Sequence, residues 1–291
     1  MKIYIPLFYS EKIKRPGEKY FLRHILGEDY AVLLLSFTCF SPHPLLSAIG
    51  LFLLQIAFWC VYEIGYVEND RMGEKFEDKA VLSHSYKSNE YAFQWWQPWL
   101  WAIALSIIAV NVLKPEILRS NNSLVELLTS EFNHELFYQS GALLCWLGFL
   151  LILRLLFHLY NNLNKQSRVW LYLLLQGFRY CGYLVLLTTN IIGLILMISN
   201  VLTRSIQYIL YRYMGGKKSD WPMDFPRYFF FLLLYFFLLG LFALNNRDIS
   251  LIVNFQVALV IVFSFLRGSR NFHKVSSQFV HVSEDGSNKI T

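Results

Sequence analysis

Long apolar runs alternate with short polar segments along most of this 291-residue chain. A run of about 18 or more apolar residues is long enough to cross the hydrocarbon core of a bilayer as a helix. Such a helix satisfies its own backbone polar groups within the lipid. The pattern therefore predicts an all-α, polytopic bundle of about eight transmembrane helices. The predicted spans are 20–40, 45–67, 95–113, 137–158, 169–188, 191–211, 228–244 and 249–266.

Particular residues set two of the breaks between these spans. Pro42 and Pro44 follow the first apolar run and mark a tight turn before the second helix. Only the tripeptide TTN separates the fifth span from the sixth, and Arg179 interrupts the fifth. A single helix through both would be about forty residues long, which is too long for any bilayer. We therefore expect two helices that form a hairpin.

The composition agrees with a membrane protein. Hydrophobic residues make up 55% of the chain, charged residues 16%, and the mean hydropathy is +0.39. These values exclude an ordinary soluble domain. We expect three segments, which are a basic cytoplasmic segment over 1–29, a transmembrane helical domain over 30–266 and a polar tail over 267–291.

The positions of Lys and Arg predict the orientation of the bundle, because cytoplasmic loops accumulate these residues. Most of them lie before the first span, after every second span and in the tail. The segments expected on the other side carry only Lys114, Arg119 and Arg247. The pattern predicts a multi-pass protein of the cell (inner) membrane with both termini in the cytoplasm.

An acidic stretch, ENDRMGEKFED, follows directly on the second apolar run. If the second helix continues past Tyr66, Asp70, Glu74 and Asp78 form one row along it. Carboxylates at this spacing repel one another on a bare helix, and a bound cation reverses the sign of that effect. Mg²⁺ prefers oxygen ligands of this kind, usually together with substrate phosphates. The alternative is a charged segment in contact with solvent.

A second acidic pair, Asp220 and Asp224, lies in the cytoplasmic segment after the sixth span. The two acidic sites are therefore expected on the same side of the membrane. Facing carboxylates of this kind hold metal ions that neutralise a diphosphate and make it a good leaving group. The basic residues expected to contact its phosphate oxygens are Arg71, Lys75, Lys217 and Lys218.

Glu63 is an acid inside the second span, and it shares a helical face with Tyr66 and Asp70. An ionisable residue at such a position is by default a functional candidate. Three roles stay open. Glu63 orients a metal-bound water, holds Arg179, or belongs to a satisfied ion pair between helices.

These motifs resemble those of the UbiA family of intramembrane prenyltransferases. Members carry an acidic motif, NDxxDxxxD, at the cytoplasmic end of the second helix and a DxxxD-type motif after the sixth. The stretch NDRMGEKFE has Asn69 and Asp70 in place, Gly73 where an Asp is usual, and Glu77 for the last Asp. Glu74 compensates for Gly73 if the helix ends or unwinds there, as a glycine permits. The Arg-Pro-rich segment that commonly follows the first motif is missing.

The resemblance implies a UbiA-like helical bundle in which Mg²⁺ binds the diphosphate of an isoprenoid donor. The allylic C–O bond then ionises, and an acceptor of unknown identity captures the carbocation. The expected partners are the isoprenoid diphosphate donor, the acceptor and the lipid bilayer, and no nucleic acid is expected. The implied catalytic residues are Asn69, Asp70, Glu74, Glu77, Asp220 and Asp224, and all of these except Asn69 are the implied metal ligands.

Two other classes of function remain. In a transporter or a membrane-embedded assembly factor, the acidic residues are solvated segments. Spans broken by Pro and Gly favour a transporter, and this chain has few such breaks. In a degenerate member of the family, the isoprenoid is bound but not turned over, and Gly73 is the reason to consider it.

Overall fold

The computed structural model describes residues 3–76, 82–88, 93–120, 125, 135–164, 167–213 and 225–269. Within these ranges the chain is helical with short connections and contains no strand. The α-helices are α1 (Ala31–Phe37), α2 (Pro44–Phe76), α3 (His84–Ser88), α4 (Trp96–Val112), α5 (Lys114–Ser120), α7 (Glu135–Asn162), α8 (Arg168–Cys181), α9 (Ile191–Tyr213), α10 (Phe225–Asn246) and α11 (Phe255–Gly268). The π- and 3₁₀-helical segments are η1 (Tyr9–Lys14), η2 (Phe21–Tyr30), η3 (Gly182–Val185) and η5 (Ile249–Leu251).

Five of the described helical segments are long and apolar enough to cross a membrane, so the chain is a multi-pass helical membrane protein. They are Pro44–Phe76, Tyr138–Asn162, Ile191–Leu210, Arg227–Asn246 and Ile249–Gly268. A sixth is possible if α4 and α5, which meet at a bend of 72°, count as one span.

The remaining predicted spans are helical but do not reach this standard. The first consists of η2 and α1 and carries Arg23, Glu28 and Asp29. The fifth is α8, which has 14 residues and ends before the short turn η3. The predicted break between the fifth and sixth spans is confirmed, since α9 starts anew at Ile191. A bundle of about eight membrane-crossing helices stays a prediction.

The chain divides into two compact units, residues 1–201 and 202–291. In the second unit α10 packs against α11. Asn254 caps the start of α11 by accepting a hydrogen bond from the backbone N–H of Gln256 at 2.9 Å. Near the other end of α11, the Arg267 Nε donates to the Tyr228 hydroxyl of α10 at 3.3 Å.

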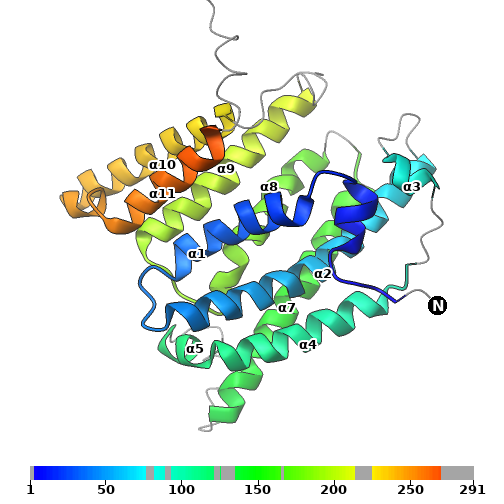
Figure 1. Ribbon diagram of the computed structural model, residues 1–291, viewed down its shortest axis with the longest axis horizontal. Coiled ribbons are helices and arrows are strands. Elements are labelled where there is room, and N and C mark those ends of the chain that lie inside the picture. Colours follow the sequence, from blue (N-terminus) through cyan, green and yellow to red (C-terminus); the bar gives the residue numbers. More distant parts are fainter. Residues whose placement is uncertain are drawn as a thin grey trace, which may run out of the picture. The chain divides into compact units, whose positions relative to one another are not determined.

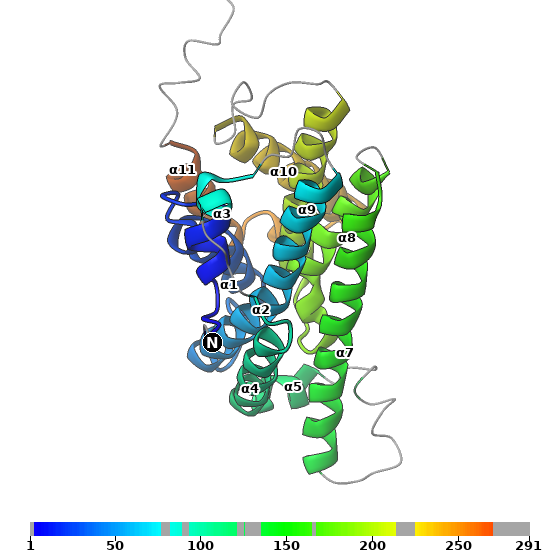
Figure 2. The same ribbon diagram turned by 90° about the vertical axis from the view of Figure 1, so that its right-hand side faces the viewer.

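The helix α2 is the centre of the first unit. It begins at Pro44, as the predicted turn requires, and both α4 and α7 pack on it and on each other. Figure 1 shows α1, α2 and α4 side by side, and Figure 2 shows α7 along α2. The middle of α2 is buried on all sides, and Phe58 and Tyr62 pack there with aromatic residues of α7 and η3.

Gly65 lets α7 approach α2 closely. A methyl group at this position would lie 2.4 Å from the Phe157 ring of α7. We therefore expect Gly65→Ala to reduce the free energy of unfolding by about 1–3 kcal/mol, the usual cost of overpacking a core. The matched control is Gly148→Ala in α7, where the new methyl group meets nothing within 4 Å. Thermal unfolding in detergent measures both, and equal midpoints for the two variants would contradict this account.

The N-terminal segment, residues 3–15, folds back onto α2. Its side chains alternate, so that Tyr4, Leu7 and Tyr9 are buried while Ile3 and Ile5 are exposed. Figure 1 shows its dark blue helical turn beside the far end of α2 and next to α3. The hydroxyl of Ser83, just before α3, donates to the Ile13 carbonyl at 2.5 Å. This segment covers the part of α2 that leads to the acidic stretch.

Candidate functional site at the acidic end of α2

The acidic stretch extends α2 as a regular helix to Phe76. The condition under which Glu74 was expected to compensate for Gly73, an end or unwinding of the helix there, is therefore not met, since the helix continues past Gly73. Successive side chains of an unbroken helix point about 100° apart. Asn69 and Asp70 consequently face different neighbours, and Asp70 and Glu74 lie on one side because they are four residues apart.

Asp70 faces the N-terminal segment and is 4% exposed. Its Oδ2 accepts a hydrogen bond from the Tyr9 hydroxyl at 2.7 Å, and its Oδ1 forms an ion pair with the Lys14 ammonium. Burial and the neighbouring Asp70 carboxylate raise the pKa of Tyr9 well above its ordinary value, so this phenol stays a donor. The cation that shares the charge of Asp70 in this structure is the chain's own Lys14.

Glu63 lies two turns before Asp70 on the same face of α2 and is fully buried. Its Oε2 accepts hydrogen bonds from the Tyr4 hydroxyl at 2.5 Å and from the Leu7 backbone N–H at 2.9 Å. Its Oε1 accepts from the Ser10 backbone N–H at 2.6 Å. The predicted common face of Glu63 and Asp70 is confirmed, and this face holds the N-terminal segment.

Arg179 pairs with Asp29 and not with Glu63, so one of the roles considered for Glu63 is wrong. The Arg179 Nε donates to Asp29 Oδ2 at 2.8 Å, the Nη2 of Arg179 contacts the same oxygen, and the Tyr180 hydroxyl donates to Asp29 Oδ1 at 2.5 Å. The guanidinium also lies over the Trp59 ring, 4.8 Å from its centre. Every member of this group is buried, so it is a satisfied structural ion pair between η2 and α8.

Glu74 is exposed and accepts a hydrogen bond from the Tyr86 hydroxyl of α3 at 2.9 Å. Burial, and then this bond, raise the pKa of Tyr86 to about 12. The two predicted phosphate contacts on α2 are both exposed and both lie over aromatic rings. Arg71 stacks on Trp95 and Lys75 on Phe76.

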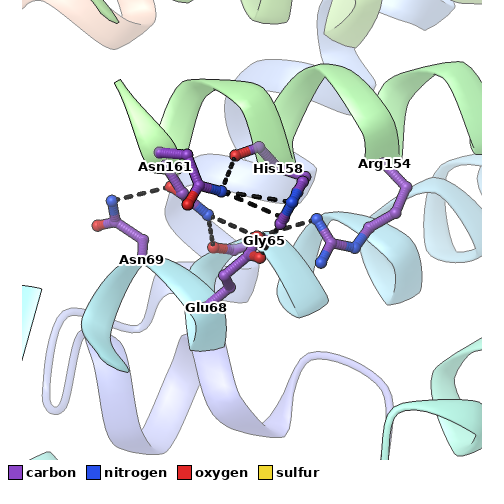
Figure 3. Close-up of polar contacts among 7 residues, drawn as sticks. Gly65, Glu68, Asn69, Arg154, His158 and Asn161 are labelled. Carbon is purple, nitrogen blue, oxygen red and sulfur yellow. Dashed lines mark hydrogen bonds and ion pairs between the residues drawn. The ribbon is translucent and has the colours of Figure 1, made fainter. Parts of the chain in front are cut away.

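Asn69 turns toward α7 and joins a polar cluster that Figure 3 shows. Its amide donates to Asn161 Oδ1 at 3.0 Å. The centre of the cluster is Glu68, which accepts from Arg154 Nη1 at 2.9 Å and from Asn161 Nδ2 at 3.0 Å. The His158 Nδ1 lies 2.5 Å from the other carboxylate oxygen of Glu68. Asn69 is thus directed away from Asp70.

The Glu68 cluster was not predicted from the sequence. A signal was present, because Arg154, His158 and Asn162 recur every four residues along an otherwise apolar helix. The N-terminal contacts, Tyr9 and Lys14, carry no comparable signal, since they lie in a short basic segment far from α2 in the chain.

The described residues supply two carboxylates, Asp70 and Glu74, on one side of α2. Oxygen donors of this type and number suit Mg²⁺, which commonly takes one or two carboxylates and completes its shell with water and substrate phosphate. Asn69 does not fit this set, because its amide is bonded to α7. Among the described residues no group of three or more acids, histidines or cysteines gathers as a ligand set. The other predicted site residues, Glu77, Lys217, Lys218, Asp220 and Asp224, lie outside the described residues.

Comparison with known proteins finds no matching family model, no matching curated protein and no matching solved structure. The class of the protein therefore follows from its own features. It is a helical multi-pass membrane protein whose central helix ends in an acidic stretch, with a buried carboxylate that holds an internal ammonium group.

Proposed function

We propose that this chain is a UbiA-like transferase of the cell membrane that acts on an isoprenoid diphosphate with Mg²⁺. The observation that carries the proposal is the ion pair between Asp70 and Lys14 at the end of the central membrane helix. In the proposed site a metal ion would take the place of the Lys14 ammonium beside the Asp70 carboxylate. Asp70 and Glu74 would hold the metal, and the bound metal would neutralise the diphosphate as it leaves.

The chain's own residues supply the remaining features of such a site. Arg71 and Lys75 are exposed on the same end of α2, and in the proposed site they would contact phosphate oxygens from solution. The apolar surfaces of the membrane helices suit the isoprenoid tail. The proposal includes about eight spans, both termini in the cytoplasm, and Asp220 and Asp224 as the second acidic motif.

The test is binding of a radiolabelled isoprenoid diphosphate to the purified full-length protein with and without Mg²⁺. We expect Asp70→Asn to weaken the Mg²⁺-dependent binding by at least about tenfold, because a ligand charge of a metal site is lost. Asp248→Asn is the matched control, since it makes the same change at a partly exposed cap outside the acidic stretch. Binding that does not depend on Mg²⁺, or that survives Asp70→Asn, would contradict the transferase.

A second candidate is a degenerate member that binds the isoprenoid without turning it over. The observation in its favour is that Tyr9 and Lys14 already satisfy Asp70 in the folded chain. Gly73 removes one further ligand of the usual motif, and the bond to Asn161 of α7 occupies the Asn69 amide. Tight binding of the donor with no release of diphosphate in the presence of candidate acceptors would select this function.

A further inference from the structure

The two sides of helix α4 indicate which environment surrounds this part of the first unit. Gln97 and Ser106 lie on the buried side of α4, whereas Trp101 and Ile107 lie on its exposed side. A helix at the surface of a soluble protein has the opposite arrangement, with its polar side chains outside. Large apolar side chains outside and polar ones inside suit contact with the acyl chains of a membrane.

The start of the N-terminal segment lies level with the first turn of α4 (Figure 1). The backbone N–H of Tyr4 donates to the Gln97 Oε1 at 2.6 Å. Trp96, the first residue of α4, is 52% exposed, and exposed tryptophans at the end of an apolar helix are typical of the boundary between lipid and water. Ile3 and Ile5, on either side of Tyr4, are 81% and 59% exposed. Two large apolar side chains are therefore uncovered at the level where this boundary is expected.

Farther along the chain, exposed apolar and exposed basic side chains lie close together in sequence. Phe8 caps the helical turn η1 and is four residues from Lys12, and Lys19 lies three residues before Leu22. All four side chains are exposed. Over residues 3–23 basic residues outnumber acidic ones by five to two, and none of the described residues forms an ion pair with Lys12 or Lys19. This combination is typical of a segment that lies on a membrane surface, with its apolar side chains at the acyl boundary and its ammonium groups among the headgroups.

We propose that residues 3–23 lie in the boundary between lipid and water, where Lys12 and Lys19 bind the headgroups of anionic phospholipids. The buried side of the segment is fixed on α2 by Glu63 and Asp70, so its exposed side meets the surroundings in one orientation. A lipid surface fits this side better than a soluble partner does, because the exposed apolar residues stand singly and are accompanied by basic ones. The proposal does not rest on the proposed function, since the phospholipid is a bound lipid and not a substrate.

The experiment places the photoreactive residue p-benzoylphenylalanine in the full-length protein. It replaces Ile5, Leu22 or, as a positive control, Leu100, which is 57% exposed on α4. Each variant is reconstituted in nanodiscs of phosphatidylcholine with a minority of phosphatidylglycerol, irradiated and analysed by mass spectrometry. We expect phospholipid adducts at all three positions. At Leu22 the ratio of phosphatidylglycerol to phosphatidylcholine in the adducts should exceed the ratio at Leu100 by at least about fivefold, the effect of one lysine beside an anionic surface.

Variants without the lysines test the source of this enrichment. When Lys12→Gln and Lys19→Gln are combined, the ratio at Leu22 should fall to the ratio at Leu100, while phospholipid adducts still form. Arg247→Gln is the matched control, because it removes an exposed positive charge outside residues 3–23 and should leave the ratio unchanged.

Several results would overturn the proposal. One is the absence of phospholipid adducts at Ile5 and Leu22 while Leu100 forms them, and another is crosslinking of these two positions to a second copy of the chain instead. A ratio at Leu22 that equals the ratio at Leu100, or that survives the loss of both lysines, would contradict binding of anionic headgroups. The assay contains neither isoprenoid nor divalent cation, so its outcome is independent of the proposed transferase.

Discussion

Replacing Arg179 with methionine is expected to lower the free energy of unfolding by about 3–5 kcal/mol, the usual cost of removing one partner from a buried ion pair. Asp29 is 2% exposed and would keep its charge. Of the three contacts with Arg179 and Tyr180 described above, it would retain the hydrogen bond from the Tyr180 hydroxyl. Loss of this size lowers the midpoint of thermal unfolding by about 10 °C in a chain of this length. Thermal unfolding of the purified protein in detergent measures it.

Two further variants separate the buried charge from other effects of the mutation. Glu18→Gln breaks the exposed pair between Arg15 and Glu18, and pairs of this kind contribute about 0–1 kcal/mol. The double variant Asp29→Asn with Arg179→Met removes both charges, so it should recover a large part of the lost stability. A double variant as unstable as Arg179→Met would mean that packing of the guanidinium on Trp59, and not its charge, is what the single variant loses.

Replacing Glu63 with leucine is expected to free the inner part of the N-terminal segment. The Leu7 and Ser10 backbone N–H groups would lose their acceptor at a buried position, at a cost of about 1–3 kcal/mol for each buried group left unpaired. The left-handed conformation of Leu7 would lose the contact that enforces it. We expect the protection of these two amides against hydrogen exchange to fall by about a hundredfold.

Hydrogen exchange measured by mass spectrometry over residues 3–15 tests this expectation. Glu63→Gln is the conservative variant, because it keeps one acceptor oxygen in place and should lose less protection than Glu63→Leu. Helix α4 is the internal reference, and its amides should change little. Full protection of Leu7 and Ser10 in Glu63→Leu would show that the segment is held by packing of Tyr4 and Tyr9 and not by the carboxylate.

The site was predictable from the sequence in part. Asp70, Glu74 and Glu63 stood out because acids are costly next to or within a membrane helix, and the helical period put Glu63 and Asp70 on one face. Their partners were not predictable. Arg179 lies 150 residues from Asp29, and Lys14 lies 56 residues from Asp70, so helical periodicity relates neither pair. Which acid meets which base depends on how the helices pack.

The sequence by itself determined that this is a helical membrane protein, where its main helices begin and where the acid-rich end of the central helix lies. These properties depend on the free-energy cost of exposing backbone polar groups and charges to lipid. The order of apolar and polar residues along the chain determines where that cost arises. Only the tertiary structure decided that α2 stays helical through Gly73, that Asn69 turns to α7, and that the N-terminal segment lies on Glu63 and Asp70. Those outcomes arise from contacts between residues far apart in the chain, where burial selects one hydrogen-bond partner from several that the sequence allows.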